Sequence, residues 1–200
     1  NMNRPLGTHV GNSLEIIETI QILSGKGPDD SIKLTKLFAE TMLNLGGLAE
    51  GQNSPASRIE QAIDSGAALD KFCEMVHAQG GDVSTIEDPG KLPLGKHSTK
   101  FKAEQTGYVQ SIDTRLVGLA ASVLGAGRGS ITDAIDPGVG FIFHNKTGDR
   151  VSEGETILEI VYNDPGKLVE SNRLLESAIA IGDEEVQLEP LVLDQIRGDC

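Results

Sequence analysis

The sequence predicts a protein of the α/β class, in an α+β arrangement within this chain: helices come first and a β-rich module follows. Apolar residues recur every three to four positions up to about residue 80, whereas they tend to alternate afterwards. Gly and Pro separate the two stretches in residues 82–97. Leu, Ile, Val and Phe account for 55 of the 200 residues, above the roughly 20% below which disorder is expected. We therefore expect a helical part (1–81), a connector (82–97) and a β-rich module with flanking helices (98–200).

The helical part is expected to contain four helices. Asn12 is a suitable N-cap, and Glu15 three positions later would complete a capping box. Ser54-Pro55 combines an N-cap with proline at the first helical position. The expected helices are residues 12–23, residues 31–45 after a cap at Asp29, Asp30 or Ser31, a third from Pro55 through Ile63, and a fourth through Leu69, Phe72, Cys73 and Val76 that Gly80-Gly81 ends.

Strands are expected after the connector. Gly107 lies at or beside the turn between the first two strands, and Asp113 is a suitable helix cap. In the last helix, Leu168, Leu174, Leu175, Ala178 and Ile179 would share one face. The expected elements are strands near 99–104 and 107–112, a helix near 113–124, strands near 139–144 and 155–162, a helix from about Pro165 to Ile181, and a terminal strand within 186–196.

The helix expected at 31–45 carries an apolar stripe for which the chain offers no matching sheet. The stripe consists of Leu34, Leu37, Phe38, Met42 and Leu45. In the α/β class such stripes cover a parallel sheet, yet residues 1–80 contain no convincing strand. We therefore expect residues 1–80 to bury their stripes poorly and residues 98–181 to form the more independent core.

Charge and cysteine content narrow the possible partners. The net charge is −13 and the isoelectric point is about 4.6, so phosphate backbones and anionic lipids would be repelled and neither nucleic acid nor membrane is expected as a partner. Cys73 and Cys200 are far apart in the sequence, which argues against a disulfide framework and favours a reducing cytoplasm. Cys73 lies on an apolar helix face and is expected to be buried and inert.

Two short motifs suggest phosphate binding, but a structural interpretation is favoured for each. Gly125-x-Gly127-x-Gly129 follows a helix, whereas a dinucleotide loop follows a strand and opens a helix. Lys96-His97-Ser98-Thr99 has no glycine loop after it to donate backbone N–H groups. We interpret the first as a backbone turn and the second as a solvated loop before a strand. A zinc site is not expected, because the four histidines are scattered: His9, His77, His97 and His144.

Glu15 and Glu18 lie three positions apart and share one edge of the first helix. One interpretation is a solvated face. The other is metal ligation by Glu18, which would need further oxygens, such as backbone carbonyls in the Leu6–His9 turn.

Residues 148–160 have the pattern of a hammerhead β-module and resemble the half-motif of biotinyl and lipoyl carrier domains. Such carriers present a modified lysine at a hairpin tip in a Met-Lys-Met or Asp-Lys-Ala setting, which this chain lacks. We therefore expect a barrel-sandwich module with a structural role.

A larger set of motifs, in one order from Pro5 to about residue 181, resembles the pyrimidine-nucleoside phosphorylases and thymidine phosphorylases. Residues 3–27 are similar to the family segment Pro-Leu-Gly-x-x-x-Gly-Asn-x-x-Glu-x-x-Glu. Residues 182–200 carry little signal. The other matches are Leu43, Ala49, Ser65-Gly66-Ala67-Ala68 through Phe72, Ala78-Gln79-Gly80-Gly81, Leu92-Pro93, Gly107-Tyr108-Val109, Leu124-Gly125-Ala126-Gly127-Arg128, Asp136-x-x-Val139-Gly140 and Lys146-x-Gly148-Asp149.

This resemblance implies that the chain is the C-terminal half of a longer enzyme, with the later helices of an α/β domain followed by a barrel-sandwich-hybrid-like C-terminal module. Family members cleave a pyrimidine nucleoside with phosphate to the base and a pentose 1-phosphate, typically as homodimers of chains about twice this length. Their phosphate segment, Lys-His-Ser before a Gly-Gly loop, and their base-contacting residues would precede Asn1. No catalytic or cofactor-binding residue is therefore assigned in this chain, and Lys96-His97-Ser98 is similar to the phosphate segment by letters alone.

The resemblance also implies a potassium site. Leu6 and His9 match cation ligands of the family through their backbone carbonyls, and Glu18 matches through its carboxylate. The remaining ligands would lie in the missing N-terminal half, beside the phosphate loop.

We therefore expect the parent protein to be a cytoplasmic, homodimeric pentosyltransferase of nucleoside salvage that uses potassium, with phosphate as co-substrate. Its missing N-terminal half would be the partner of this chain, which is expected to be inactive alone. Two alternatives remain: a stand-alone barrel-sandwich binding module, and part of a phosphorylase that acts on nucleoside monophosphates.

Overall fold

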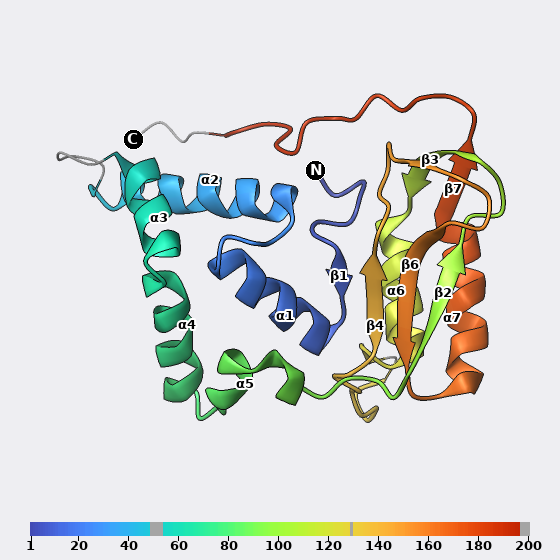
Figure 1. Ribbon diagram of the computed structural model, residues 1–200, viewed down its shortest axis with the longest axis horizontal. Coiled ribbons are helices and arrows are strands. Elements are labelled where there is room, and N and C mark those ends of the chain that lie inside the picture. Colours follow the sequence, from blue (N-terminus) through green and yellow to red (C-terminus); the bar gives the residue numbers. More distant parts are fainter. Residues whose placement is uncertain (49–53, 129, 197–200) are drawn as a thin grey trace. The chain divides into compact units, whose positions relative to one another are not determined.

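Figure 1 shows the computed structural model, which describes residues 1–48, 54–128 and 130–196. These residues form seven α-helices and seven strands, so the predicted mixture of helices and strands is confirmed. The chain divides into two compact units. We call Glu15–Pro93 the helical unit, and Asn1–Leu14 together with Leu94–Cys200 the β unit. Each is described by itself.

The helical unit contains the four helices that the sequence predicted. Ser54 caps the third helix as expected, since its side chain accepts a hydrogen bond from the Ser57 backbone N–H at 3.2 Å. Asn12 differs from its predicted role as a cap: it is the first residue of the helix, and its side-chain amide donates to the Ala126 carbonyl at 2.9 Å. The helices are α1 (Asn12–Leu23, which begins in the β unit), α2 (Asp29–Leu45), α3 (Pro55–Asp64), α4 (Ala67–Ala78) and α5 (Ser84–Glu87), followed by the 3-10 turn Pro89–Lys91.

The apolar stripe of α2 is largely exposed. Met42 and Leu45 are 69% and 84% exposed, and Phe38 is more than half exposed. Ile20 and Ile86 are the buried hydrophobic side chains of the helical unit among the described residues. This burial pattern supports the expectation that the stripes of residues 1–80 are poorly covered.

The β unit is built from two antiparallel sheets. One sheet has the strand order β1-β4-β6-β2 and the other β5-β3-β7. The strands are β1 (His9–Val10), β2 (His97–Lys102), β3 (Gly107–Ile112), β4 (Gly140–Phe143), β5 (Arg150–Val151), β6 (Thr156–Tyr162) and β7 (Ile179–Gly182), with α6 (Thr114–Leu124) and α7 (Pro165–Ala178) as its other helices. Figure 1 shows β1 beside β4, at one edge of the larger sheet.

The core of the β unit lies between these sheets and the two helices. Val109, Phe141, Leu158 and Leu175 are fully buried in it. The Ser171 hydroxyl, also fully buried, donates to the Ala120 carbonyl at 3.0 Å and so links α7 to α6. Asp113 caps α6 as predicted, by accepting from the Leu116 N–H at 3.0 Å.

Several predicted boundaries in the β unit are wrong. The helix expected to reach Ile181 ends at Ala178, and Ile179 begins β7, which pairs with β3. The strand expected near 99–104 is β2, which spans His97–Lys102, and the strand expected near 107–112 is β3; the two belong to different sheets. The terminal strand expected within 186–196 is absent, since no helix or strand is present there. β1 was not predicted at all.

No helix in the described part of the chain has both the length and the apolar character needed to cross a membrane.

Candidate functional site

The candidate cation ligands Leu6 and His9 lie in a turn that leads into β1. Gly7 has φ +68°, a left-handed conformation that glycine adopts without strain. After this turn, the Phe143 N–H donates to the Thr8 carbonyl at 2.7 Å. His9 then lies opposite Ile142 and Val10 opposite Phe141 in the antiparallel pair of β1 and β4. The turn is therefore attached to the larger sheet of the β unit.

The close approach of β1 to β4 depends on two glycines. A Cβ atom on Gly140 would lie 2.0 Å from the Val10 carbonyl oxygen, and one on Gly11 would lie 2.4 Å from the Val139 carbonyl oxygen. Both glycines also have positive φ values, +154° and +127°. These positions require glycine, which explains the Val-Gly pairs at 10–11 and 139–140 in structural terms.

The strand register indicates the direction of the His9 carbonyl. Thr8 and Phe143 are joined by a hydrogen bond, so the next opposed pair, His9 and Ile142, falls at a non-hydrogen-bonded position. The backbone N–H and C=O of such a residue point away from the partner strand. Because β1 lies at the edge of the sheet, the His9 carbonyl is directed away from β4, toward the outside of the sheet.

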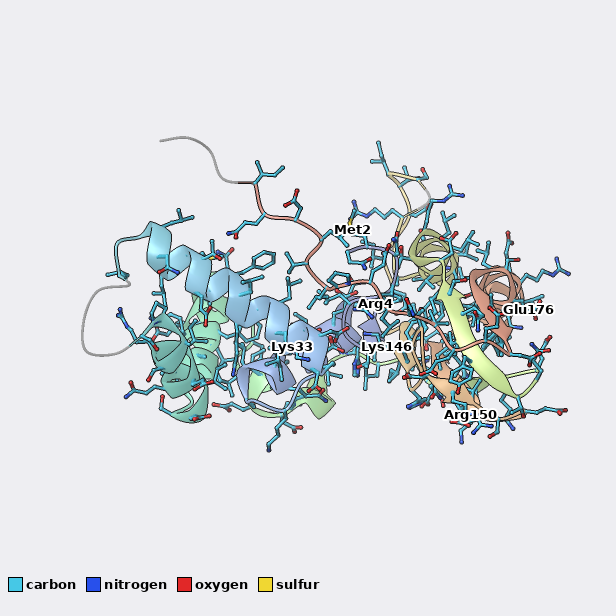
Figure 2. All side chains as sticks on the ribbon, turned by 90° about the horizontal axis from the view of Figure 1, so that it is seen from above. Met2, Arg4, Lys33, Lys146, Arg150 and Glu176 are labelled. Atoms are coloured by element: carbon cyan, nitrogen blue, oxygen red, sulfur yellow. The ribbon has the colours of Figure 1, made fainter. Side chains whose placement is uncertain are left out.

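A lysine from a distant turn holds the carbonyl next to Leu6. Lys146 Nζ donates to the Gly7 carbonyl at 2.7 Å, and the contact is partly buried. The Lys146 backbone N–H in turn donates to Asp149 Oδ2 at 2.7 Å, and the Asp149 N–H donates to the Lys146 carbonyl at 3.0 Å. Figure 2 labels Lys146. The sequence offered no signal for this contact, because Lys146 and Gly7 are 139 positions apart.

Glu18, the third candidate ligand, lies on α1 in the helical unit. Its exposed fraction is 7%, whereas Glu15 is exposed. Ser31 Oγ, also buried, donates to Glu18 Oε1 at 3.4 Å. The solvated-face interpretation therefore holds for Glu15 but is wrong for Glu18. A carboxylate with so little exposure requires donors or cations around it, because its desolvation is costly.

The three candidate ligands are thus divided between the units: Leu6 and His9 belong to the β unit and Glu18 belongs to the helical unit. Their donor atoms are carbonyl and carboxylate oxygens, the ligand type that hard cations prefer. The His9 ring makes a local contact instead, with Nδ1 2.9 Å from Thr8 Oγ1. Within the described residues, no group of three or more His, Cys, Asp or Glu side chains could hold a metal ion. Carbonyl and carboxylate oxygens suit an oxygen-liganded cation better than a transition metal, and the assignment of Leu6, His9 and Glu18 to one site stays a prediction.

The motifs interpreted as structural make structural contacts. The loop predicted for Lys96-His97-Ser98-Thr99 is wrong for its last three residues, which begin β2, and the His97 ring lies 5.5 Å from that of Tyr162 between centroids. The Lys96 N–H donates to Asn163 Oδ1 at 2.9 Å. At the end of α6, the Gly125 N–H donates to the Ser122 carbonyl at 3.1 Å and the Ala126 N–H donates to the Ala121 carbonyl at 2.9 Å, which are contacts of a backbone turn. Gly129 lies outside the described residues.

Cys73 and Asp82 lie outside the candidate site. Cys73 is half-buried rather than buried, and Cys200 lies outside the described residues. Asp82 is exposed, and hydrogen bonds from the Ser84 hydroxyl and the Ser84 backbone N–H hold the pKa of its carboxyl below the ordinary value. This aspartate stabilises the first turn of α5 and belongs to no candidate site.

The C-terminal segment of the β unit holds the residues that precede the Leu6–His9 turn. Asn3 Nδ2 donates to Glu189 Oε2 at 3.1 Å, and Arg4 Nη2 donates to the Glu189 carbonyl at 3.4 Å. Apart from the terminal strand expected within 186–196, the sequence analysis assigned no role to residues 182–200. No periodic pattern in residues 183–196 could have indicated these contacts with the N-terminal residues.

Comparison with known proteins shows what the chain is similar to. Residues 108–182 match the family described as "Pyrimidine nucleoside phosphorylase C-terminal domain". The chain is 40% identical over 187 residues to a "Pyrimidine-nucleoside phosphorylase" of Staphylococcus aureus (strain bovine RF122 / ET3-1). It is 39% identical, over the same length, to the proteins with that name in strains USA300 and NCTC 8325 / PS 47. Each match covers 92% of this chain and 42% of the relative, so the chain spans less than half the length of these curated relatives.

Proposed function

Since the chain belongs to the pyrimidine-nucleoside phosphorylase family, we propose that it is the C-terminal portion of an enzyme that cleaves pyrimidine nucleosides with inorganic phosphate. The products would be the free base and a pentose 1-phosphate. The observation that carries this proposal is the roughly 40% identity over 92% of the chain. The match of residues 108–182 to the C-terminal domain of the family supports the same assignment.

The chain would contribute to this reaction by positioning rather than by bond chemistry. The residues with candidate roles are two backbone carbonyls, at Leu6 and His9, and one carboxylate, at Glu18. None is a nucleophile or an acid–base pair. The phosphate- and base-contacting groups would come from the rest of the enzyme, which would be the partner of this chain. Nucleoside cleavage requires such order, because phosphate must be aligned against the departing base.

The proposed cation is potassium. The outward direction of the His9 carbonyl and the burial of Glu18 support the assignment. Bound potassium would supply positive charge and order to the segments that hold it. Leu6, His9 and Glu18 would provide some of its oxygen ligands, and upstream residues the others. A cytoplasmic location and a homodimeric parent enzyme complete the proposal, as the resemblance implies.

The first prediction is that this 200-residue chain alone releases no base from uridine or thymidine in phosphate buffer, because it lacks the family's phosphate and base contacts. The change in absorbance on base release measures the reaction. The same assay on the chain joined to an upstream part like that of its relatives should show turnover. Sustained turnover by the rigorously purified chain alone would contradict the proposal and would make Lys96 and His97 the next residues to substitute.

A second candidate function is favoured by the self-contained core of the β unit, whose buried cluster draws on both of its sheets and both flanking helices. Such a core could serve as a stand-alone binding module. Intact-mass measurement of the native protein tests this class, since a lysine carrying lipoate or biotin would support it. Part of a nucleoside-monophosphate phosphorylase remains an alternative for the parent enzyme, and assays with a nucleoside and its monophosphate would distinguish the two substrates.

A further inference from the structure

We propose that Lys146 is a positioning residue for the Leu6–His9 turn, which it holds in the conformation that presents cation ligands. The proposal rests on the function proposed above for its link to potassium. The contact itself, from Lys146 Nζ to the Gly7 carbonyl at 2.7 Å, lies wholly within the β unit.

The turn needs such a contact because its central residue is a glycine. Gly7 adopts φ +68°, and glycine has access to more backbone conformations than any other residue. Rotation about Gly7 would swing the Leu6 carbonyl relative to the His9 carbonyl. On the His9 side the backbone is fixed by the Phe143–Thr8 hydrogen bond and by pairing with β4. Lys146 fixes the peptide plane between Gly7 and Thr8, and so extends the anchored backbone from Thr8 up to Gly7.

Lys146 can act in this way because its own backbone is fixed. Asp149 binds the Lys146 N–H through its side chain, and the same turn is attached to β3 at two points. The Gly148 N–H donates to the Val109 carbonyl at 2.8 Å, and the Val109 N–H donates to the Asp149 carbonyl at 2.9 Å. Val109 is fully buried. The ammonium group is therefore presented by an ordered turn that is anchored in the core.

A charged donor makes this hydrogen bond stronger than one between neutral groups. Its positive charge would also repel a cation bound to the neighbouring carbonyls, which has the opposite effect on cation affinity. The positioning effect of Lys146 on cation affinity is the larger of the two. The two effects predict shifts of opposite sign when Lys146 is replaced by a neutral side chain of similar length.

The first arm of the test uses the 200-residue chain and hydrogen exchange measured by NMR. The Phe143 amide is the direct probe, because it donates to the Thr8 carbonyl. Lys146→Met should speed exchange at Phe143 about tenfold, the loss expected for one charge-assisted hydrogen bond. Lys146→Arg, which keeps the charge and the donors, should restore most of the protection. Lys100→Met is the matched control, because Lys100 is an exposed lysine on β2 of the same unit.

The second arm uses the full-length enzyme and a potassium titration in which choline chloride keeps the ionic strength constant. Lys146→Met should raise the half-saturating potassium concentration several-fold while the rate at saturating potassium changes little, and Lys146→Arg should lie near the wild type. Unchanged exchange at Phe143 in Lys146→Met, or the same acceleration in Lys100→Met, would overturn the positioning role. A lower half-saturating concentration in Lys146→Met would show that repulsion dominates and would also overturn it.

These outcomes are distinct from failure of the proposed function. A full-length wild-type enzyme that shows no phosphorolysis would refute that function. An active enzyme whose rate does not depend on potassium would refute the link to the cation. In that case, hydrogen exchange at Phe143 would still test whether Lys146 positions the Gly7 carbonyl.

Discussion

Two glycines at the junction of β1 and β4 show how strongly single positions constrain the β unit. Gly140→Ala would place a methyl carbon 2.0 Å from the Val10 carbonyl oxygen at φ +154°. We expect this change to lower the free energy of unfolding by about 3 kcal/mol, because backbone strain and the displacement of β1 add together. Urea denaturation of the 200-residue chain measures the effect.

Gly118→Ala provides the control for this substitution. Gly118 lies on the exposed side of α6, where an added Cβ meets nothing within 4 Å. This change should raise the free energy of unfolding by about 0.5–1 kcal/mol, since alanine favours a helix interior over glycine. Equal effects of the two substitutions would contradict the close-approach argument.

The carboxylate of Glu18 is the residue-scale test of the proposed cation site. In the full-length enzyme, Glu18→Gln should raise the potassium concentration needed for half-maximal activity, because the amide keeps the size of the side chain but removes its charge. Glu15→Gln is the matched control, three positions away on the same helix and exposed. If Glu18→Gln left the half-maximal potassium concentration unchanged, Glu18 would not be a ligand of the site.

At the scale of elements, α2 presents an apolar face without a covering layer among the described residues. Phe38, Met42 and Leu45 are each more than half exposed, an arrangement that favours association. We expect the 200-residue chain to self-associate in sedimentation experiments. Met42→Lys combined with Leu45→Lys should weaken this association and change the free energy of unfolding by less than about 0.5 kcal/mol.

A matched substitution elsewhere tests whether the α2 face is responsible. Leu119 on α6 is 45% exposed, in the β unit. Leu119→Lys should leave self-association unchanged. If it weakened association as much as the α2 substitutions did, the association would not depend on the apolar stripe of α2.

Elements with local start signals were predictable from the sequence, and elements that depend on distant contacts were not. Ser54 and Asp113 cap α3 and α6 as expected, because a cap involves residues only three positions apart. β7 was missed because Ile179 fits the helical period of Leu175 and Ala178 as well as the strand period of Ile181. β1 was missed because two residues carry no period, and its pairing depends on β4 some 130 positions later.

The candidate site shows the same limit. The sequence resemblance identified Leu6, His9 and Glu18 as candidate ligands. It could not show that Glu18 is buried or that the His9 carbonyl points away from β4, toward the outside of the sheet. The direction of the His9 carbonyl follows from pairing with a strand some 130 positions later, and Glu18 is in contact with Ser31 on the next helix. The role of Lys146 is likewise visible only from its contact with Gly7.

For the whole molecule, the distribution of buried residues predicts unequal stability of the two units. The cluster of fully buried hydrophobic side chains lies entirely in the β unit, within residues 103–178. Amides in residues 98–162 should therefore exchange much more slowly than those of α1 and α2. Exchange of the 200-residue chain, measured at a concentration where it is monomeric, tests this. Equal protection of α1 and α2 in a demonstrated monomer would contradict the argument that their apolar faces lack a partner.

The position of β1 also limits how far this protein can be truncated before it aggregates. A polypeptide limited to residues 108–182 would keep β4 and β6 but lose β1 and β2, the strands on either side of that pair. Both margins of the truncated sheet would then present unpaired N–H and C=O groups, which act as templates for strands of other molecules. We expect this truncated polypeptide to aggregate through intermolecular β-sheets. The segment that matches the family model is thus narrower than the unit in which β1 and β2 cover the β4–β6 pair, and that unit includes the residues from Gly7 to Gly11.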